Sequence, residues 1–145
     1  MSPDRSGSAD ADPRLAQVRA MAPGTLLERM GIEFQQAGPH RLVATMPVAG
    51  NTQPIGLLHG GASCVLAETL GSVGATLHGA DRGLVAVGIE ISATHHRSTG
   101  TGLVTGTATA LHLGGTVASY AIEITDESGR LLCSARLTCL LRRPS

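Results

Sequence analysis

The chain has 145 residues, of which 42% are hydrophobic, and this predicts one compact domain rather than a disordered chain. Eleven basic residues balance eleven acidic ones, which removes the general electrostatic case for binding nucleic acid or an anionic membrane. Phe34 and Tyr120 are the only large aromatic side chains, so stacking of bases on exposed rings is excluded as well.

The N-terminal half predicts a tail, a short helix, two strands and a long helix. Residues 1–13 are polar, and we expect a flexible tail that is not a secretory signal. Pro23-Gly24 stops the first helix. The expected elements are a helix over 14–21, strands over 31–35 and 41–46, a loop over 50–58 and a nearly buried helix over 59–77.

The C-terminal half changes character after Asp81-Arg82-Gly83 and becomes rich in Val, Ile, Thr and Leu. Turn residues separate its apolar runs. The runs predict four sequential strands, over 84–92, 103–111, 117–125 and 131–141. Two strands, one long helix and four further strands indicate an α+β fold, an antiparallel sheet wrapped around the helix, without the βαβ alternation of a doubly wound sheet.

The three cysteines match no spacing of a metal site. Cys64 lies in an apolar run, while Cys133 and Cys139 fall on the same face of a predicted strand. We therefore expect reduced, packed thiols in a cytoplasmic protein. No segment approaches the roughly twenty apolar residues of a membrane span, so no membrane partner is expected.

One charged residue stands in the middle of the apolar helix. Between Leu42 and Ala80, Glu68 is the single residue with a formal charge. A carboxylate among apolar neighbours is costly unless it is paired, hydrogen-bonded or protonated. Glu68 is therefore either a helix residue that reaches solvent or a structural partner, or a partly desolvated general base or nucleophile.

The start of the same helix predicts a second functional group. Gly60-Gly61 would expose backbone N–H groups at the positive end of the helix, where they can stabilise an oxyanion, although the pair is also compatible with a tight entry turn. Gly60 and Glu68 are eight residues apart, or about 12 Å along a helix axis. Groups so far apart on one chain can hardly flank one carbonyl carbon, so joint action implies a dimer with shared sites.

Residues 53–72 read Gln-Pro-Ile-Gly-Leu-Leu-His-Gly-Gly at their start and Leu-Ala-Glu-Thr-Leu-Gly-Ser at their end, and related patterns follow at 88–98, 111–114 and 126–138. Together they resemble hotdog-fold acyl-CoA thioesterases of the Arthrobacter-type 4-hydroxybenzoyl-CoA thioesterase branch, which includes 1,4-dihydroxy-2-naphthoyl-CoA hydrolases and phenylacetate-pathway thioesterases. The resemblance implies a single hotdog domain over 14–145 that hydrolyses an aromatic or medium-sized acyl-CoA. It further implies a homodimer that pairs into a tetramer. No cofactor is expected, because CoA is part of the substrate.

The resemblance also assigns catalytic roles. It makes Glu68 the catalytic carboxylate, as base or nucleophile, and Gly60 the oxyanion donor from the neighbouring subunit. Gln53 would orient the thioester or the attacking water, and His59 would brace the loop and its hydrogen bonds. Ser72 lies one turn beyond Glu68 and would stand near that water.

CoA contacts are implied in two further segments. Gly115-Thr116 stands where some relatives carry longer or more basic residues, so we expect no strong phosphate contact there. Because adjacent strand residues face opposite ways, His95 and His96 are not expected to form a metal site. The implied contacts are Gly88, His95, Arg97, Ser98, His112, Gly114, Gly115 and Thr116.

Three other functions compete with thioester hydrolysis. A hotdog hydratase or dehydratase would use His59 as its base, but no separate hydratase motif is present. A non-catalytic acyl-CoA binding module would keep the site without turnover, and the absence of a DNA-binding segment disfavours a ligand-sensing repressor. A purely structural protein would leave Glu68 without a role.

Overall fold

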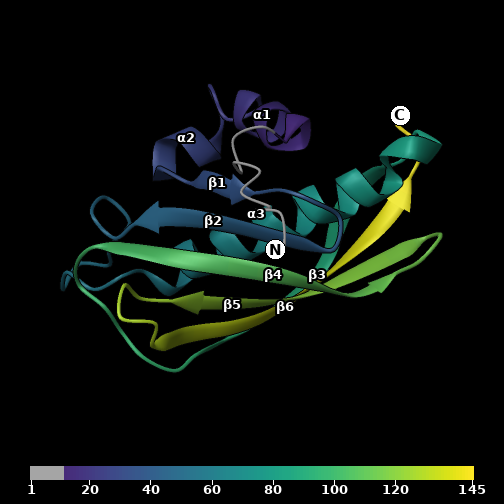
Figure 1. The fold of residues 1–145 in the computed structure, drawn as a ribbon. Helices are drawn as coiled ribbons and strands as arrows, with labels where there is room; N and C mark the ends of the chain where they lie inside the picture. Colours follow the sequence, from purple (N-terminus) through teal and green to yellow (C-terminus); the bar gives the residue numbers. More distant parts are fainter. Residues whose placement is uncertain (1–11) are drawn as a thin grey trace, which may run out of the picture.

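The computed structural model describes residues 12–145, so residues 1–11 of the expected tail lie outside the described residues. One six-stranded antiparallel sheet lies against the long helix α3, Gly60–Gly79, as Figure 1 shows. The strand order is β1-β2-β4-β5-β6-β3. The strands are β1 (Glu33–Gln36), β2 (Arg41–Pro47), β3 (Val85–His95), β4 (Leu103–Leu113), β5 (Val117–Thr125) and β6 (Leu131–Arg142). The predicted sheet around one central helix is confirmed.

The N-terminal helices differ from the predicted ones. Helix α1 (Pro13–Ala20) begins one residue before the expected start, because Pro13 fits the first helical position and the Asp12 side chain accepts a hydrogen bond from the Arg14 N–H. Pro13, which was expected to be the last residue of the tail, therefore belongs to helix α1. A second helix, α2 (Leu26–Met30), was not predicted. Gly31 ends it with a φ of 71°, so β1 begins later than expected.

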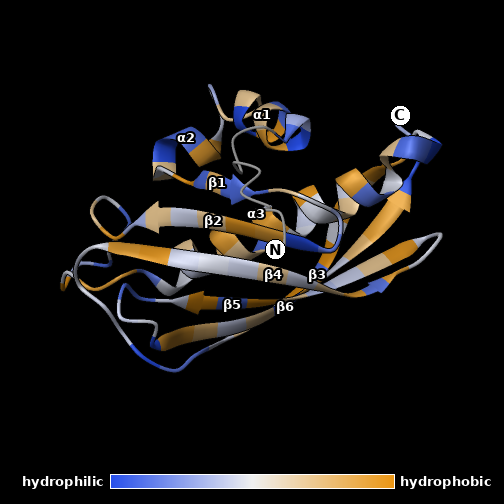
Figure 2. Ribbon diagram, in the orientation of Figure 1, coloured by the Kyte–Doolittle hydropathy of each residue, from blue (hydrophilic) through white to orange (hydrophobic). Residues whose placement is uncertain are grey.

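Helix α3 packs closely on the sheet because glycines replace larger residues on its buried face. A Cβ at Gly71 would lie 2.5 Å from Leu137 Cδ2, and one at Gly74 would lie 2.7 Å from Leu42 Cδ1 and the Tyr120 hydroxyl. The Tyr120 hydroxyl donates to the Pro39 carbonyl at 2.6 Å. Figure 2 shows apolar residues along this helix and the sheet. In residues 12–145, no helix has the length and apolar character to cross a membrane.

Strand β3 contains a bulge that sets which of its side chains face α3. The pairing with β6 shifts between Gly88 and Glu90. Before the shift Ala86 packs against the core, and after it Ile91 and Ala93 do so. The even-numbered residues therefore face the helix before the bulge and the odd-numbered residues after it. This puts Gly88 and the strand's last residue on the same face.

Strand β3 also forms one edge of the sheet. In the part of the chain described here it pairs with β6 alone, although it is eleven residues long. Val85, Val87 and Ile89 are exposed on it. A long apolar edge strand offers a row of unpaired backbone groups to another chain.

The 3₁₀ turn η2 (Ala80–Arg82) follows α3, and Gly83 ends it with a φ of 66°. The end of α3, the tip of the β4–β5 hairpin and the end of β6 gather on one side of the molecule (Figure 1). The start of α3 lies far from this side, since a helix of 20 residues is roughly 30 Å long.

Candidate active site

The start of α3 presents a free backbone amide. His59 is the N-cap, and its Nδ1 accepts a hydrogen bond from the Gly61 N–H at 2.8 Å. A neutral His59 ring therefore carries its proton on Nε2. Within the described chain, the Gly60 N–H has no acceptor. This N–H stands at the positive end of the helix dipole, where it can bind an oxygen that gains negative charge.

The imidazole of His95 lies directly against Gly60. A Cβ at Gly60 would be 3.0 Å from His95 Nε2, so the absent side chain lets the ring approach the helix start. His95 reaches this place because the β3 bulge turns its side chain toward α3. The sequence resemblance implied a CoA contact for His95, but its geometry puts it beside the proposed oxyanion donor. His96 differs, since its Nε2 lies 3.0 Å from Ser134 Oγ.

A cavity of about 390 Å³ opens at this point, and we call it the Gly60 cavity. It brings together four of the sequence-predicted residues, Gly60, His95, Arg97 and Ser98. Its full lining is Leu58, Gly60, Ser63, His95, His96, Arg97, Ser98, Thr99 and Leu132.

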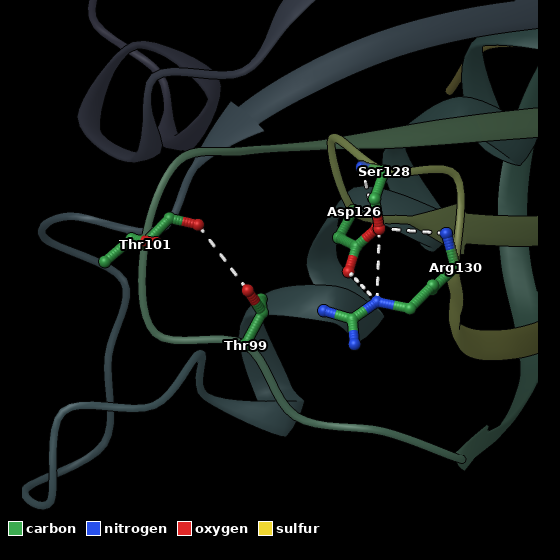
Figure 3. A network of polar contacts seen from close by, with 5 residues as sticks. All are labelled: Thr99, Thr101, Asp126, Ser128 and Arg130. Carbon is green, nitrogen blue, oxygen red and sulfur yellow. Dashed lines mark hydrogen bonds and ion pairs between the residues drawn. The ribbon is translucent and has the colours of Figure 1, made fainter.

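A network of polar contacts occupies the turn between β5 and β6, outside the residues that line the Gly60 cavity. Figure 3 shows the hydrogen bonds among Asp126, Ser128 and Arg130 in this turn and, separately, the contact between Thr99 and Thr101. Asp126 accepts hydrogen bonds from the Ser128 hydroxyl at 2.7 Å and the Arg130 N–H at 2.9 Å, and these hold the pKa of Asp126 at about 2. The next residue, Glu127, accepts from the Leu103 N–H. The residues of this segment predict a turn, and the resemblance includes them in the pattern over 126–138 without assigning them a role.

Glu68 is exposed in the single chain, which agrees with the alternative of a helix residue that reaches solvent; one copy alone does not desolvate the carboxylate. The reason is its place over the edge strand: a Cβ at Gly88 would be 2.9 Å from Glu68 Oε1, and no further strand covers that side in the described chain. Glu68 does not line the Gly60 cavity. The two residues stand two turns apart on one helix, about 12 Å along its axis.

Ser72 and Gln53 lie outside the Gly60 cavity. Ser72 borders a smaller, mainly apolar cavity of about 190 Å³ between α1 and α3, which we call the Ser72 cavity. The pKa of Cys139 is raised, chiefly by burial; a hydrogen bond with the Ser72 side chain lowers it, and the charge of Glu68 raises it. Cys139, Ser72 and Glu68 are therefore neighbours. The Gln53 side-chain oxygen accepts a hydrogen bond from the Ile55 N–H at 2.9 Å, so in one chain this side chain is bound within its own loop.

Four further predicted CoA contacts lie at the other end of α3. The turn that follows β4 contains Gly114, whose carbonyl is 2.8 Å from His78 Nε2 near the helix end. Apart from Gly88, which lies beside Glu68, the predicted contacts therefore form two separate groups in one chain, and the structure does not bring them together. The second group is His112, Gly114, Gly115 and Thr116.

Two features of the described residues bear on other chemistry. No group of three or more His, Cys, Asp or Glu side chains in residues 12–145 is arranged to hold a metal ion. The three cysteines are free thiols, with Cys64 half-buried and Cys133 and Cys139 buried. Burial raises the pKa of Cys133 as well as Cys139, which makes both poor nucleophiles.

The sequence and the fold match known proteins. A family model described as the thioesterase superfamily matches residues 55–133. The proofreading thioesterase EntH of Cronobacter turicensis is 50% identical over 86% of this chain and 90% of its own. The 1,4-dihydroxy-2-naphthoyl-CoA hydrolase of Escherichia coli is 49% identical over 86% of this chain and 91% of its own.

Solved structures agree. A thioesterase from Haemophilus influenzae superposes with a TM-score of 0.84 at 36% identity, covering 89% of this chain and 90% of its own. A mutant thioesterase from Pseudomonas aeruginosa gives 0.83 at 37% identity, over 97% and 95%. This chain has the hotdog fold and is a thioester hydrolase that belongs to the thioesterase superfamily.

Proposed function

We propose that this enzyme hydrolyses aromatic or medium-sized acyl-CoA thioesters at sites shared between two copies of the chain. The observation that carries the proposal is the unpaired Gly60 N–H beside His95, at the mouth of a cavity. A thioester carbonyl placed there would accept this N–H, and its oxygen would gain charge at the positive end of α3.

Glu68 would come from the second copy. If two β3 edges pair antiparallel around a point between Ile91 and Ser92, Gly88 of one copy lies opposite His95 of the partner subunit. Because Glu68 covers Gly88 and His95 covers Gly60, this register brings Glu68 of one copy toward Gly60 of the partner subunit. The pairing would also cover the exposed carboxylate and so supply the desolvation expected from the sequence.

The chemistry then follows one of two routes. As a general base, Glu68 takes a proton from water, the hydroxide attacks the carbonyl carbon, and the C–S bond breaks with the proton passing to the departing thiolate. As a nucleophile, Glu68 attacks the carbonyl carbon and the C–S bond breaks, so that the CoA thiolate leaves and takes a proton from solvent; water then cleaves the resulting anhydride into the free acid and the Glu68 carboxylate. Gln53 would turn from its own loop to orient the water or thioester, His59 would brace the helix start, and Ser72 would bind the water. Both routes need no cofactor.

The Ser72 cavity supports the size of the acyl group. Its apolar lining and its volume of about 190 Å³ suit an aromatic ring or a medium-length acyl chain. The cavity borders Ser72, which lies on the same face of α3 as Glu68. The printed name of the Escherichia coli relative, 1,4-dihydroxy-2-naphthoyl-CoA hydrolase, points to the same kind of substrate.

Further assembly and location are also proposed. On the outer sheet face, Leu140 pairs with Val87 on one side and Val117 on the other, which makes an apolar row across three strands. A second dimer packed on this row would give the expected tetramer. Free cysteines fit a reducing compartment, here the cytoplasm.

The proposal is tested with a panel of aromatic, medium-chain and long-chain acyl-CoA thioesters in an assay for released thiol. We expect fastest hydrolysis of aromatic or medium-sized acyl groups. Water addition to an enoyl-CoA without thiol release would favour the hydratase alternative. Tight CoA binding with no turnover of any thioester would favour the binding module.

A further inference from the structure

Asn51 is one of the few polar residues that the described chain buries, and 9% of its surface is exposed. Its Nδ2 donates to the Met30 carbonyl and to the Pro47 carbonyl, each at 2.8 Å. A carbonyl oxygen only accepts, so the NH₂ group of the amide faces both partners and uses both of its N–H groups. These two contacts hold the side chain in one position, because a buried amide is costly unless it is hydrogen-bonded.

The two carbonyls lie at the ends of two different elements. Met30 is the last residue of α2, where a carbonyl has no partner within the helix, and Pro47 is the last residue of β2. The Asn51 N–H also donates to the Val48 carbonyl at 2.9 Å. Asn51 therefore ties the end of a helix and the end of a strand to the loop that leads into α3.

The backbone carbonyl of Asn51 holds the residue that precedes α3. It accepts from the His59 N–H at 2.9 Å, and Thr52 and Leu58 form a bridge next to this contact. The loop between Asn51 and His59 is thus closed at its base. A continuous connection runs from α2 and β2 through Asn51 to the start of α3.

The position of His59 in turn sets the direction of the Gly60 N–H. His59 is the N-cap of α3, and its Nδ1 accepts from the Gly61 N–H. The peptide that joins His59 to Gly60 is planar, so the Gly60 N–H moves with His59. We propose that Asn51 is a positioning residue of the hydrolysis: its contacts fix His59 and thereby aim the Gly60 N–H at the thioester oxygen. This inference rests on the role that the proposed function gives to Gly60.

Asn51 does not line the Gly60 cavity, so its effect on a substrate passes through the backbone. An oxyanion donor contributes most in the transition state, where the charge develops, and a misplacement of about 1 Å can slow a reaction roughly a hundredfold. Binding of the thioester in its ground state depends less on this donor. A looser start of α3 should therefore lower kcat more than it changes KM.

The test compares Asn51→Ala with Tyr120→Phe, a matched control. Tyr120→Phe also removes a side-chain donor from a backbone carbonyl, that of Pro39, but Tyr120 does not line the Gly60 cavity. Steady-state kinetics use the best substrate of the acyl-CoA panel, at a temperature at which thermal melts show that both variants are folded. We expect kcat to fall about tenfold in Asn51→Ala, with KM within about twofold of the wild-type value. Tyr120→Phe should melt at a lower temperature and keep both constants.

Amide hydrogen exchange measures the start of α3 without any substrate. The His59 N–H should exchange slowly in the wild type and about ten times faster in Asn51→Ala, whereas Tyr120→Phe should leave its exchange unchanged. If Asn51→Ala does not fold, exchange in the wild type decides: a protected His59 N–H supports the inference, and an unprotected one overturns it.

Three kinetic results would overturn the positioning role of Asn51. They are an unchanged kcat in Asn51→Ala, a KM that rises as much as kcat falls, and an equal loss of kcat in Tyr120→Phe. If the wild type hydrolyses no thioester of the panel, the proposed function fails, and exchange alone then decides on Asn51. Unchanged protection of the His59 N–H in Asn51→Ala would overturn this inference too.

Discussion

Glu68 carries the reaction in this account, although one copy of the chain leaves it exposed. Glu68→Gln keeps the size and hydrogen-bonding capacity of the side chain and removes its charge. We expect kcat to fall by roughly two to four orders of magnitude, the usual effect of losing a positioned acid–base group. Steady-state kinetics on the best substrate of the acyl-CoA panel measure the loss, and a thermal melt checks that folding is intact.

Cys64 provides the matched control, because it lies one turn before Glu68 on the same helix and would be the tempting nucleophile of a thioester enzyme. It has a carboxylate rather than a cation near it in sequence. Cys64→Ser should keep most activity. Near-normal kcat in Glu68→Gln, or an inactive but folded Cys64→Ser, would mean that another residue performs the chemistry.

At the residue scale, the sequence predicted which groups to examine but not their surroundings. Glu68 stood out as an isolated charge, and Gly60 as a bare helix start. The exposure of Glu68 could not be predicted, because it depends on an edge strand whose position follows from the whole sheet. The place of His95 depends on the bulge at Gly88–Glu90, which no alternation in the sequence reveals.

Helix α3 depends on glycines that let it approach the sheet. In Gly74→Ala the new Cβ would fall 2.7 Å from Leu42 Cδ1 and from the Tyr120 ring, whose hydroxyl is anchored on Pro39. Overpacking of this kind costs about 1–3 kcal/mol, and it offsets a gain of up to about 1 kcal/mol in helix propensity. We expect urea unfolding to show net destabilisation. Gly38→Ala, where the nearest atom is 3.6 Å away, is the control, and equal stability of the two variants would contradict the close packing.

The β5–β6 turn gives a prediction about pH. The pKa of Asp126 falls from 3.8 to about 2 on folding, chiefly through the Ser128 hydroxyl and the Arg130 N–H. Because the native state favours the carboxylate, Asp126 stabilises it above pH 3.8 and loses that effect as the pH falls toward 2. Asp126→Asn should therefore be less stable than the wild type at pH 6, with the difference shrinking below pH 4 in thermal melts. A difference that is constant from pH 6 to 2.5 would contradict this role.

At the element scale, α3 and the four C-terminal strands were predicted close to their true positions, because their apolar patterns are long. The five-residue α2 was missed, since it has no buried residue and thus no apolar periodicity to detect. Strand β3 was predicted to end at Ser92 and extends to His95, because its edge position leaves many of its side chains exposed.

At the scale of the whole molecule, the proposed function requires that each copy present only part of the active site. The Gly60 amide, His95 and Arg97 share one cavity, and Glu68 does not line it. An antiparallel pairing of two β3 edges would join these halves and bury Val85, Val87 and Ile89 near the junction. The sequence implied this sharing through the spacing of Gly60 and Glu68, but the edge that permits it became visible only with the sheet order.

Mixed dimers test this sharing most directly. Gly60→Pro removes the oxyanion N–H. The first position of a helix tolerates proline, and the preceding residue, His59, is already extended. Gly60→Ala is the control that keeps the N–H. Each of Glu68→Gln and Gly60→Pro should be inactive alone. After random mixing and reassociation, about a quarter of the wild-type activity should return, because half of the dimers are mixed and each mixed dimer has one intact site. No recovery, with mixed dimers shown by mass spectrometry, would contradict the account.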